Sequence, residues 1–232
     1  MSDFFEFGFG EGDQKIGKKS KKFDPETGRT YRASFVWYKK IGTDGLPDFE
    51  AGVKFTGCER GYKQGVGYFL YKSPAYAEFG EPKQAVATII AIWPTDSKGK
   101  LDATRLSDVQ VMPWIFSADK YEELSRQNER YALTSVDYAI TCTDSKFKKL
   151  TFAPEKECLI SKLLSSGKEE LASISKGVLK EAVFVADNIR RELARDLTLE
   201  QLREAAGGAE ATPADRTRNA ADVDSLLDGV LG

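Results

Sequence analysis

Polar and apolar residues alternate along the first long hydrophobic stretch of the chain, which runs from Thr30 to Lys40. Successive side chains of an extended strand point to opposite faces. The face that begins with Tyr31 is apolar and matches the core side of a sheet. The opposite face combines cations with an aromatic ring: Arg32, Ser34, Val36, Tyr38 and Lys40. We therefore expect a strand whose second face is either solvated or in contact with a flat, negatively charged ligand.

Strand-like patterns continue to about Phe152. Seven segments have the alternation or the short apolar runs of strands: residues 30–39, 49–56, 66–72, 85–93, 108–116, 136–143 and 147–153. Residues 85–93 (AVATIIAIW) are apolar on both faces, which predicts a central strand. Turn sequences lie between strands at residues 43–45 (TDG) and 96–99 (DSKG).

Helices are expected in two regions. Ser117 is a suitable N-cap for a helix over residues 118–131, and Asp119 lies in its first turn, where a negative charge is favourable. After Pro154, an apolar stripe with helical spacing extends over residues 167–197. Thr198 and Gln201 then have the spacing of a capping box ahead of a second, shorter helix.

This order of elements predicts a mainly β protein with C-terminal helices. Strands, one helix and two further strands suit a five-stranded oligonucleotide-binding (OB) barrel with extra hairpins. A β-sandwich with an inserted helix is the alternative. The expected parts are a flexible basic arm (1–28), an OB-like domain (29–155), a helical segment (156–206) and a linker with an acidic tail (207–232).

The formal net charge is only −2, but the charges are unevenly distributed. Nine lysines and arginines and only two acidic residues lie between Lys15 and Lys40. The last residues, ADVDSLLDGVLG, carry acids and no cation. This asymmetry is a hint of nucleic-acid binding. The chain has no apolar run of transmembrane length and no signal-peptide pattern, so we expect a soluble intracellular protein.

The chain contains no histidine. Serine–histidine and cysteine–histidine catalysis are therefore impossible within it, and the commonest zinc ligand is missing. The three cysteines (Cys58, Cys142 and Cys158) form no CxxC pair and are expected to be small buried apolar residues. Catalysis by carboxylates or lysine alone stays open, but we expect no enzyme, no metal and no cofactor.

Two sequences imitate catalytic motifs and are rejected. Residues 12–19 (GDQKIGKK) nearly match a phosphate-binding loop, but Lys19 replaces the hydroxyl residue that binds magnesium. Pro47-Asp48 with residues 81–83 (EPK) resembles a metal-nuclease arrangement, but Pro82 disfavours the central strand that it needs.

Aromatic residues are concentrated near the start of the chain, with sixteen of the twenty-six before Ala77. Many stand beside cations, as in Tyr62-Lys63 and Tyr71-Lys72. Single-stranded nucleic acid is bound by this combination, because cations follow the phosphates and each stacked base contributes about 1–3 kcal/mol. Duplex recognition would instead use a reading helix or a broad cationic face, and neither is predicted. The alternative is a half-exposed sheet whose tyrosines and lysines only cover apolar surface.

Several of these patterns together resemble the single-stranded DNA-binding proteins of tailed bacteriophages. The similarity covers about residues 30–152 and the tail. It rests on YRASFVWYKK, AVATIIAIWPTDSKGKLD, VQVMPWIFSADKYEEL, VDYAITCTDSKFKKLTF and the tail DVDSLLDGVLG.

The resemblance implies an OB fold, sequence-independent binding of single strands and a C-terminal tip that recruits replication proteins. The best-known branch of that family holds zinc with cysteine and histidine. We do not expect zinc here, because histidine is missing and the cysteines are dispersed. That branch binds cooperatively through a basic N-terminal arm, a role that Lys15–Lys22 could take.

The expected site residues form four groups. The cations that neutralise phosphates are Arg32, Lys40, Lys54, Arg60, Lys63 and Lys72. The rings that stack on bases are Tyr38, Phe55, Tyr62, Tyr68 and Tyr71. The residues that close the groove from the last hairpin are Lys146, Phe147 and Lys148. The residues of the partner-binding tail are Asp222, Asp224, Leu226, Leu227 and Asp228.

We thus expect a non-enzymatic protein that coats single-stranded DNA in phage replication, recombination or repair, in the cytoplasm of the infected bacterium. Its expected partners are replication proteins such as a polymerase or helicase, with self-association along the DNA left open. Three rivals remain: a structural or protein-interaction phage component, a carboxylate–metal nuclease, and a strand-annealing protein.

Overall fold

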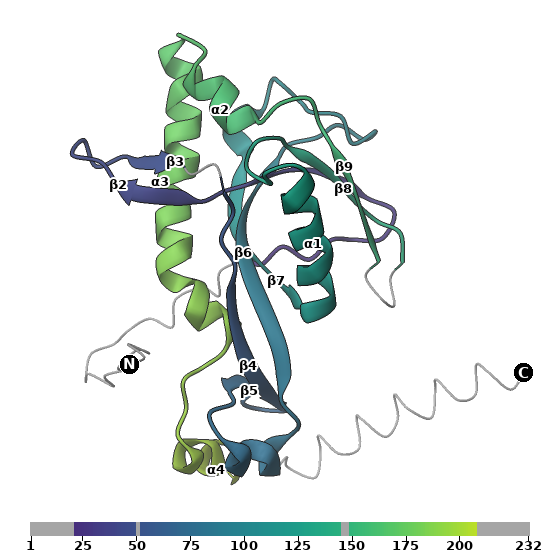
Figure 1. The fold of residues 1–232 in the computed structure, drawn as a ribbon, viewed down its shortest axis with the longest axis vertical. Helices are drawn as coiled ribbons and strands as arrows, with labels where there is room; N and C mark the ends of the chain where they lie inside the picture. The colour runs from purple at the N-terminus through teal and green to yellow at the C-terminus, as the bar shows by residue number, and fades with distance from the viewer. Residues whose placement is uncertain (1–20, 50–51, 145–148, 208–232) are drawn as a thin grey trace, which may run out of the picture.

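The computed structural model describes residues 21–49, 52–144 and 149–207 (Figure 1). The strands within these ranges are β1 (Thr30–Phe35), β2 (Tyr38–Ile41), β3 (Pro47–Phe49), β4 (Thr56–Lys63), β5 (Gly67–Leu70), β6 (Lys83–Trp93), β7 (Gln110–Ser117), β8 (Tyr138–Cys142) and β9 (Leu150–Pro154). The helices are α1 (Ala118–Arg130), α2 (Leu159–Leu164), α3 (Glu169–Leu193) and α4 (Leu199–Gly207), with short 3₁₀ turns η1 (Pro74–Phe79) and η2 (Leu106–Asp108).

β6 is the centre of an antiparallel sheet with the strand order β5-β4-β6-β1-β8-β9. Along one edge of β6, residues 83–87 pair with β4 and residues 90–93 pair with β1. β7 pairs with residues 85–92 along the other edge. The sheet therefore forks at Thr88 and Ile89 into a β1-β8-β9 wing and a β4-β5 wing, which lie toward opposite ends of the molecule (Figure 1).

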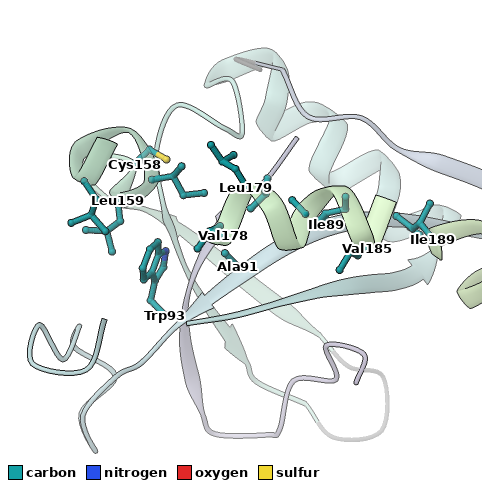
Figure 2. Close-up of a cluster of buried hydrophobic side chains, with 14 of the residues drawn as sticks. Ile89, Ala91, Trp93, Cys158, Leu159, Val178, Leu179, Val185 and Ile189 are labelled. Atoms are coloured by element: carbon teal, nitrogen blue, oxygen red, sulfur yellow. The ribbon is translucent and has the colours of Figure 1, made fainter. Parts of the chain in front are cut away.

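The first sheet face is covered by α2 and α3. Alternate residues of β6, among them Ile89, Ala91 and Trp93, pack against Val178 and Leu179 of α3 (Figure 2). The apolar stripe of the helical segment expected at residues 156–206 shares one core cluster with the sheet.

The second sheet face has its own aromatic core. Phe35, Trp114 and Tyr138 meet here, with tilted or edge-to-face rings whose centroids are 5.7 to 6.3 Å apart. Leu124 of α1 is fully buried against them. Both faces of the long central strand are therefore covered, as its apolar sequence predicts.

Part of the coarse prediction is confirmed: the chain has a mostly antiparallel sheet and C-terminal helices, but the fold is mixed rather than mainly β. The predicted strands at 85–93, 108–116, 136–143 and 147–153 correspond to β6, β7, β8 and β9. The capping box is present, because Thr198 N–H donates to Gln201 Oε1 (2.8 Å) and Gln201 N–H donates to Thr198 Oγ1 (3.2 Å). Ser117 stands at the N-cap position of α1 but makes no side-chain capping bond.

The strand expected at 30–39 is two strands in two sheets. β1 pairs with β6 as far as Phe35, which lies opposite Ile90. If β1 continued in the same register, it would reach Ala87 of β6, which already pairs with Thr56 of β4. The chain leaves the sheet at this point and forms the separate β2–β3 hairpin. The mixed face of the expected strand is also corrected, since Ser34 and Val36 are completely buried and cannot form the floor of a groove.

Two further elements differ from expectation. The pattern at residues 49–56 predicts a strand there, whereas β4 begins at Thr56. The sequence of β4, TGCERGYK, contains two glycines that weaken the strand pattern. The short helix α2 is not predicted by the sequence, because its six residues do not complete two helical turns.

The helices of the described ranges include none that is both long and apolar enough to cross a lipid bilayer.

Candidate nucleic-acid interface

Two tyrosines face each other on the outer side of the β4–β5 hairpin. Tyr62 and Tyr68 are directly paired across the two strands, and their ring centroids are 5.0 Å apart. The side chains are 57% and 45% exposed, which is unusual for large rings in this protein. The pair offers two neighbouring aromatic faces to a ligand.

Arg60 adds a cation to this pair. Its guanidinium carbon lies 3.8 Å from the centroid of the Tyr68 ring, within the range of a cation–π contact. Its Nη1 also donates to the carbonyl oxygen of Leu193, at the end of α3 (3.0 Å). Partial burial lowers the pKa of Arg60, and Tyr68 and Cys58 act in the opposite direction. The guanidinium is therefore held in one position rather than free in solvent.

Lys83 lies beside Arg60 on the next strand. The two residues are directly paired between β4 and β6, and directly paired residues share a sheet face. Lys83 is exposed. We call Arg60, Tyr62, Tyr68 and Lys83 the hairpin platform.

The opposite side of the hairpin is a small core that holds the platform in place. Phe69 is fully buried there with Tyr76 of η1 and Leu202 of α4. A side chain on Gly61 would overlap the Phe69 ring, so this strand position requires glycine. One face of the hairpin is thus anchored, and the other is left to present Tyr62 and Tyr68.

The segment after α3 supports the outer edge of the hairpin. Arg195 N–H donates to the Tyr68 carbonyl (2.9 Å), and Leu70 N–H donates to the Arg195 carbonyl (2.9 Å). The Arg195 guanidinium also donates to the carbonyl of Val66 in the hairpin turn (3.2 Å). The edge strand β5 therefore has a backbone partner and does not end the sheet with unpaired groups.

Arg32 does not belong to this surface, and its expected role is corrected. Its side chain is only 14% exposed, and its Nε pairs with the fully buried Asp137 (3.0 Å). Its Nη1 lies 3.6 Å from Glu155. Burial raises the pKa of Asp137, while hydrogen bonds from Ser34, Arg32 and the Leu159 amide act against this rise. Arg32 is therefore the counter-ion of a buried carboxylate and not a phosphate ligand.

Tyr38 and Lys40 lie on the separate β2–β3 hairpin, which crosses α3 (Figure 1). Partial burial and, to a smaller extent, Asp187 of α3 raise the pKa of Tyr38. Lys40 is exposed and lies 3.8 Å from Asp48. Neither residue is brought to the hairpin platform.

The next predicted pair, Lys54 and Phe55, precedes β4. Phe55 packs edge-to-face on Phe116 and Tyr121, on the side of the sheet that carries α1. Lys54 is exposed, and its carbonyl oxygen accepts a bond from Thr88 Oγ1 (3.1 Å). The Phe55 ring serves the core rather than a stacking surface.

The remaining described candidates lie around the anchored side of the hairpin. Lys63 is half-buried at the hairpin end, and alternation places it on the face opposite Tyr62. Tyr71 packs against Tyr76 with a centroid distance of 6.1 Å. Lys72 forms an ion pair with Asp196. Lys63, Tyr71 and Lys72 are therefore not part of the hairpin platform.

Several predicted residues lie outside the described ranges. They are Lys146, Phe147 and Lys148 of the last hairpin and Asp222, Asp224, Leu226, Leu227 and Asp228 of the tail. The lysines Lys15, Lys18 and Lys19 of the basic arm lie outside as well.

The structure adds Lys83, which sequence reasoning missed. Its neighbours in the chain, FGEPKQ, read as a loop, and only the register between β4 and β6 places it beside Arg60. The expected burial of the cysteines is met by Cys142 and Cys158, whereas Cys58 is half-buried. Across the described ranges, no cluster of three or more Cys, Asp or Glu side chains is arranged to hold a metal ion.

The chain was also compared with known proteins. No model of a known protein family matches it, and no curated protein sequence matches it either.

Proposed function

We propose that this protein binds single-stranded DNA without sequence preference and is not an enzyme. The observation that carries the proposal is the exposed Tyr62–Tyr68 pair with the Arg60 guanidinium on the Tyr68 ring. Aromatic side chains stack on any base, because every base has a π-face. Arg60 and Lys83 supply positive charge beside the rings, where a phosphate backbone would run.

The proposed biological role is to coat single strands in phage DNA replication, recombination or repair, in the cytoplasm of the infected bacterium. The acidic–leucine tip at residues 222–232 would recruit replication proteins such as a polymerase or helicase. Strand annealing is a variant of this role that uses the same surface.

The OB fold is the finer part of the proposal. β6 changes its partner from β4 to β1 along one edge, which splits the sheet into two wings. The described strands do not close into a barrel, and a partly open barrel of the OB type would need the two wings to approach each other. A pairing between the β4–β5 wing and the β8–β9 wing in an experimental structure would establish that architecture.

The experiment is a titration of the full chain with oligo-dT, followed by tyrosine and tryptophan fluorescence at several salt concentrations. We expect quenching, and we expect the affinity to fall steeply with salt because phosphate contacts release counterions. An affinity that does not change with salt would contradict phosphate binding. Labelled single strands incubated with magnesium or manganese would stay intact unless the chain is a metal nuclease.

The second candidate function is a structural or protein-interaction component of the phage. One observation favours it: an apolar groove lies between α3 and β7, and Phe184 at its side is 60% exposed. This candidate predicts no mobility shift of oligo-dT in a gel, whereas the proposed function predicts a shift.

A further inference from the structure

The groove between α3 and β7 has a volume of about 720 Å³. Its α3 wall includes Ile174, Val178 and Phe184, and its other wall includes Val109 and Val111. Most of these side chains are apolar, and Phe184 is the most exposed large apolar side chain in the described ranges, at 60%. We refer to this site as the α3–β7 groove.

Gly177 keeps the groove open. It lies inside the 25-residue helix α3, where glycine is less favourable than alanine. A Cβ atom at this position would meet nothing within 4 Å, so the packing of α3 itself does not require glycine. Gly177 lines the groove, and the space left by its missing side chain is available to a ligand.

The N-terminal arm enters the described structure at this groove. Lys21, the first described residue, lines the groove, and its Nζ donates to Gln110 Oε1 at the start of β7 (3.1 Å). Two residues later, the Phe23 amide donates to the Pro113 carbonyl of β7 (3.0 Å). Lys21 and Phe23 thus hold the start of the described chain at the rim of an apolar groove, and residues 1–20 precede this point in the sequence.

The arm contains the apolar side chains that such a groove would accept. Four phenylalanines occur within the six residues FFEFGF at positions 4–9, a density found nowhere else in the chain. Phe9 precedes Lys21 by twelve residues, and an extended chain of that length can span about 40 Å. The α3 wall from Ser173 to Val185 measures only about 18 Å at the rise of an α-helix. The phenylalanines can therefore reach every part of the groove.

The charges are compatible with this occupant. Asp3, Glu6 and Glu11 stand among or beside the phenylalanines. Lys21 is exposed in the lining of the groove. Lys180 is not a lining residue, but it is exposed on α3 four residues before Phe184 and so lies on the same side of the helix. Glu181 is the acidic residue in the lining.

We propose that the phenylalanine segment Phe4–Phe9 docks in the α3–β7 groove of its own chain. A segment tethered at the rim has a high effective concentration there, which favours it over the same segment of a second copy. The C-terminal tip is also acidic and apolar, but it follows α4, which lies beside the β4–β5 wing at the far end of the molecule (Figure 1). The proposal is independent of DNA binding.

The direct test places a photo-reactive benzoylphenylalanine at Phe7 in the full chain. Cross-linked peptides identified by mass spectrometry are expected to join residues 1–21 to residues 173–185 or 107–113 within one molecule. Cross-links between two molecules would assign the groove to the arm of a second copy. Cross-links from Phe7 to other surfaces, or no cross-links at all, would also overturn the proposal. A reactive group placed at Leu226 tests the C-terminal tip instead, and a cross-link from that position to the groove would overturn the proposal as well.

A second test uses chymotrypsin, which cuts after phenylalanine. Gly177→Trp fills the groove, and Gly177→Ala is its matched control because a Cβ meets nothing there. If cleavage requires release of the arm, its rate follows the released population, so Gly177→Trp is expected to accelerate cleavage at Phe4–Phe9 by about tenfold or more. Equal rates in the parent, the alanine variant and the tryptophan variant would overturn the proposal. The cross-link experiment leaves the groove unchanged and therefore does not depend on whether Gly177→Trp folds.

Discussion

The ring of Phe69 occupies the space that a side chain on Gly61 would need. The two residues are directly paired between β4 and β5. Through this contact the inner face of the hairpin closes on Tyr76 and Leu202, and the outer face keeps Tyr62 and Tyr68 for a ligand.

Gly61→Ala is expected to destabilise the protein by about 1–3 kcal/mol, because the added methyl group overpacks the Phe69 site. Gly57→Ala is the matched control on the same strand, since a Cβ there meets its nearest atom at an ordinary 3.7 Å. The free energy of unfolding is measured by urea denaturation. Equal stability of the two variants would show that Phe69 can move aside without loss.

Tyr62→Ala and Tyr68→Ala are each expected to weaken oligo-dT binding by about 1–3 kcal/mol, because each ring would stack on one base. Both side chains are about half exposed, so stability should change little. Tyr131→Ala is the control, as Tyr131 is 54% exposed at the end of α1. Fluorescence titrations decide the matter: if all three variants bind like the parent chain, the hairpin platform does not bind bases.

Arg32→Met is expected to cost about 3 kcal/mol of stability, because it leaves the buried Asp137 carboxylate without its counter-ion. It should not alter the salt dependence of DNA binding. Lys83→Met should leave the stability unchanged and should alter the salt dependence instead. The slope of the logarithm of the DNA-binding constant against the logarithm of the salt concentration should become smaller by about one. A reduced slope for Arg32→Met would restore Arg32 as a phosphate ligand.

Asp137 also predicts a pH dependence. Burial raises its pKa in the folded state, so the folded protein holds this proton more tightly than the unfolded chain. The resulting stabilisation is complete below the unfolded pKa of about 3.9 and is lost as the pH rises through the folded pKa. The variant Asp137→Asn has no titratable group at this position. The stability of the parent relative to this variant should therefore decrease from about pH 3.5 upward.

Denaturant unfolding of both proteins at a series of pH values measures this difference. Carboxylates that titrate in the same way in both proteins contribute equally to both stabilities, so they do not affect the difference. A difference that grows with rising pH would mean that the pairing with Arg32 outweighs burial and lowers the pKa of Asp137.

Local sequence patterns were sufficient to predict the elements that are defined by residues close to each other in the chain. The apolar run at 85–93 can only be a strand covered on both faces, and it is β6. The apolar stripe after Pro154 has helical spacing, and it is α3. Thr198 and Gln201 need only each other to cap α4. Tyr62 and Tyr68 were also expected as ligand-binding rings, because both stand in a region rich in aromatic residues and cations.

The remaining features depend on pairings between distant residues. Arg32 reads as an exposed cation until β8 places Asp137 beside it, 105 positions away. The strand at Thr30 ends early because β4 already occupies the edge of β6. Lys83 joins Arg60 only through register. The sequence alone determined elements such as β6, α3 and the cap of α4, since these depend on neighbouring side chains, whereas the tertiary structure decided where β1 ends, which charges are buried and which rings face outward.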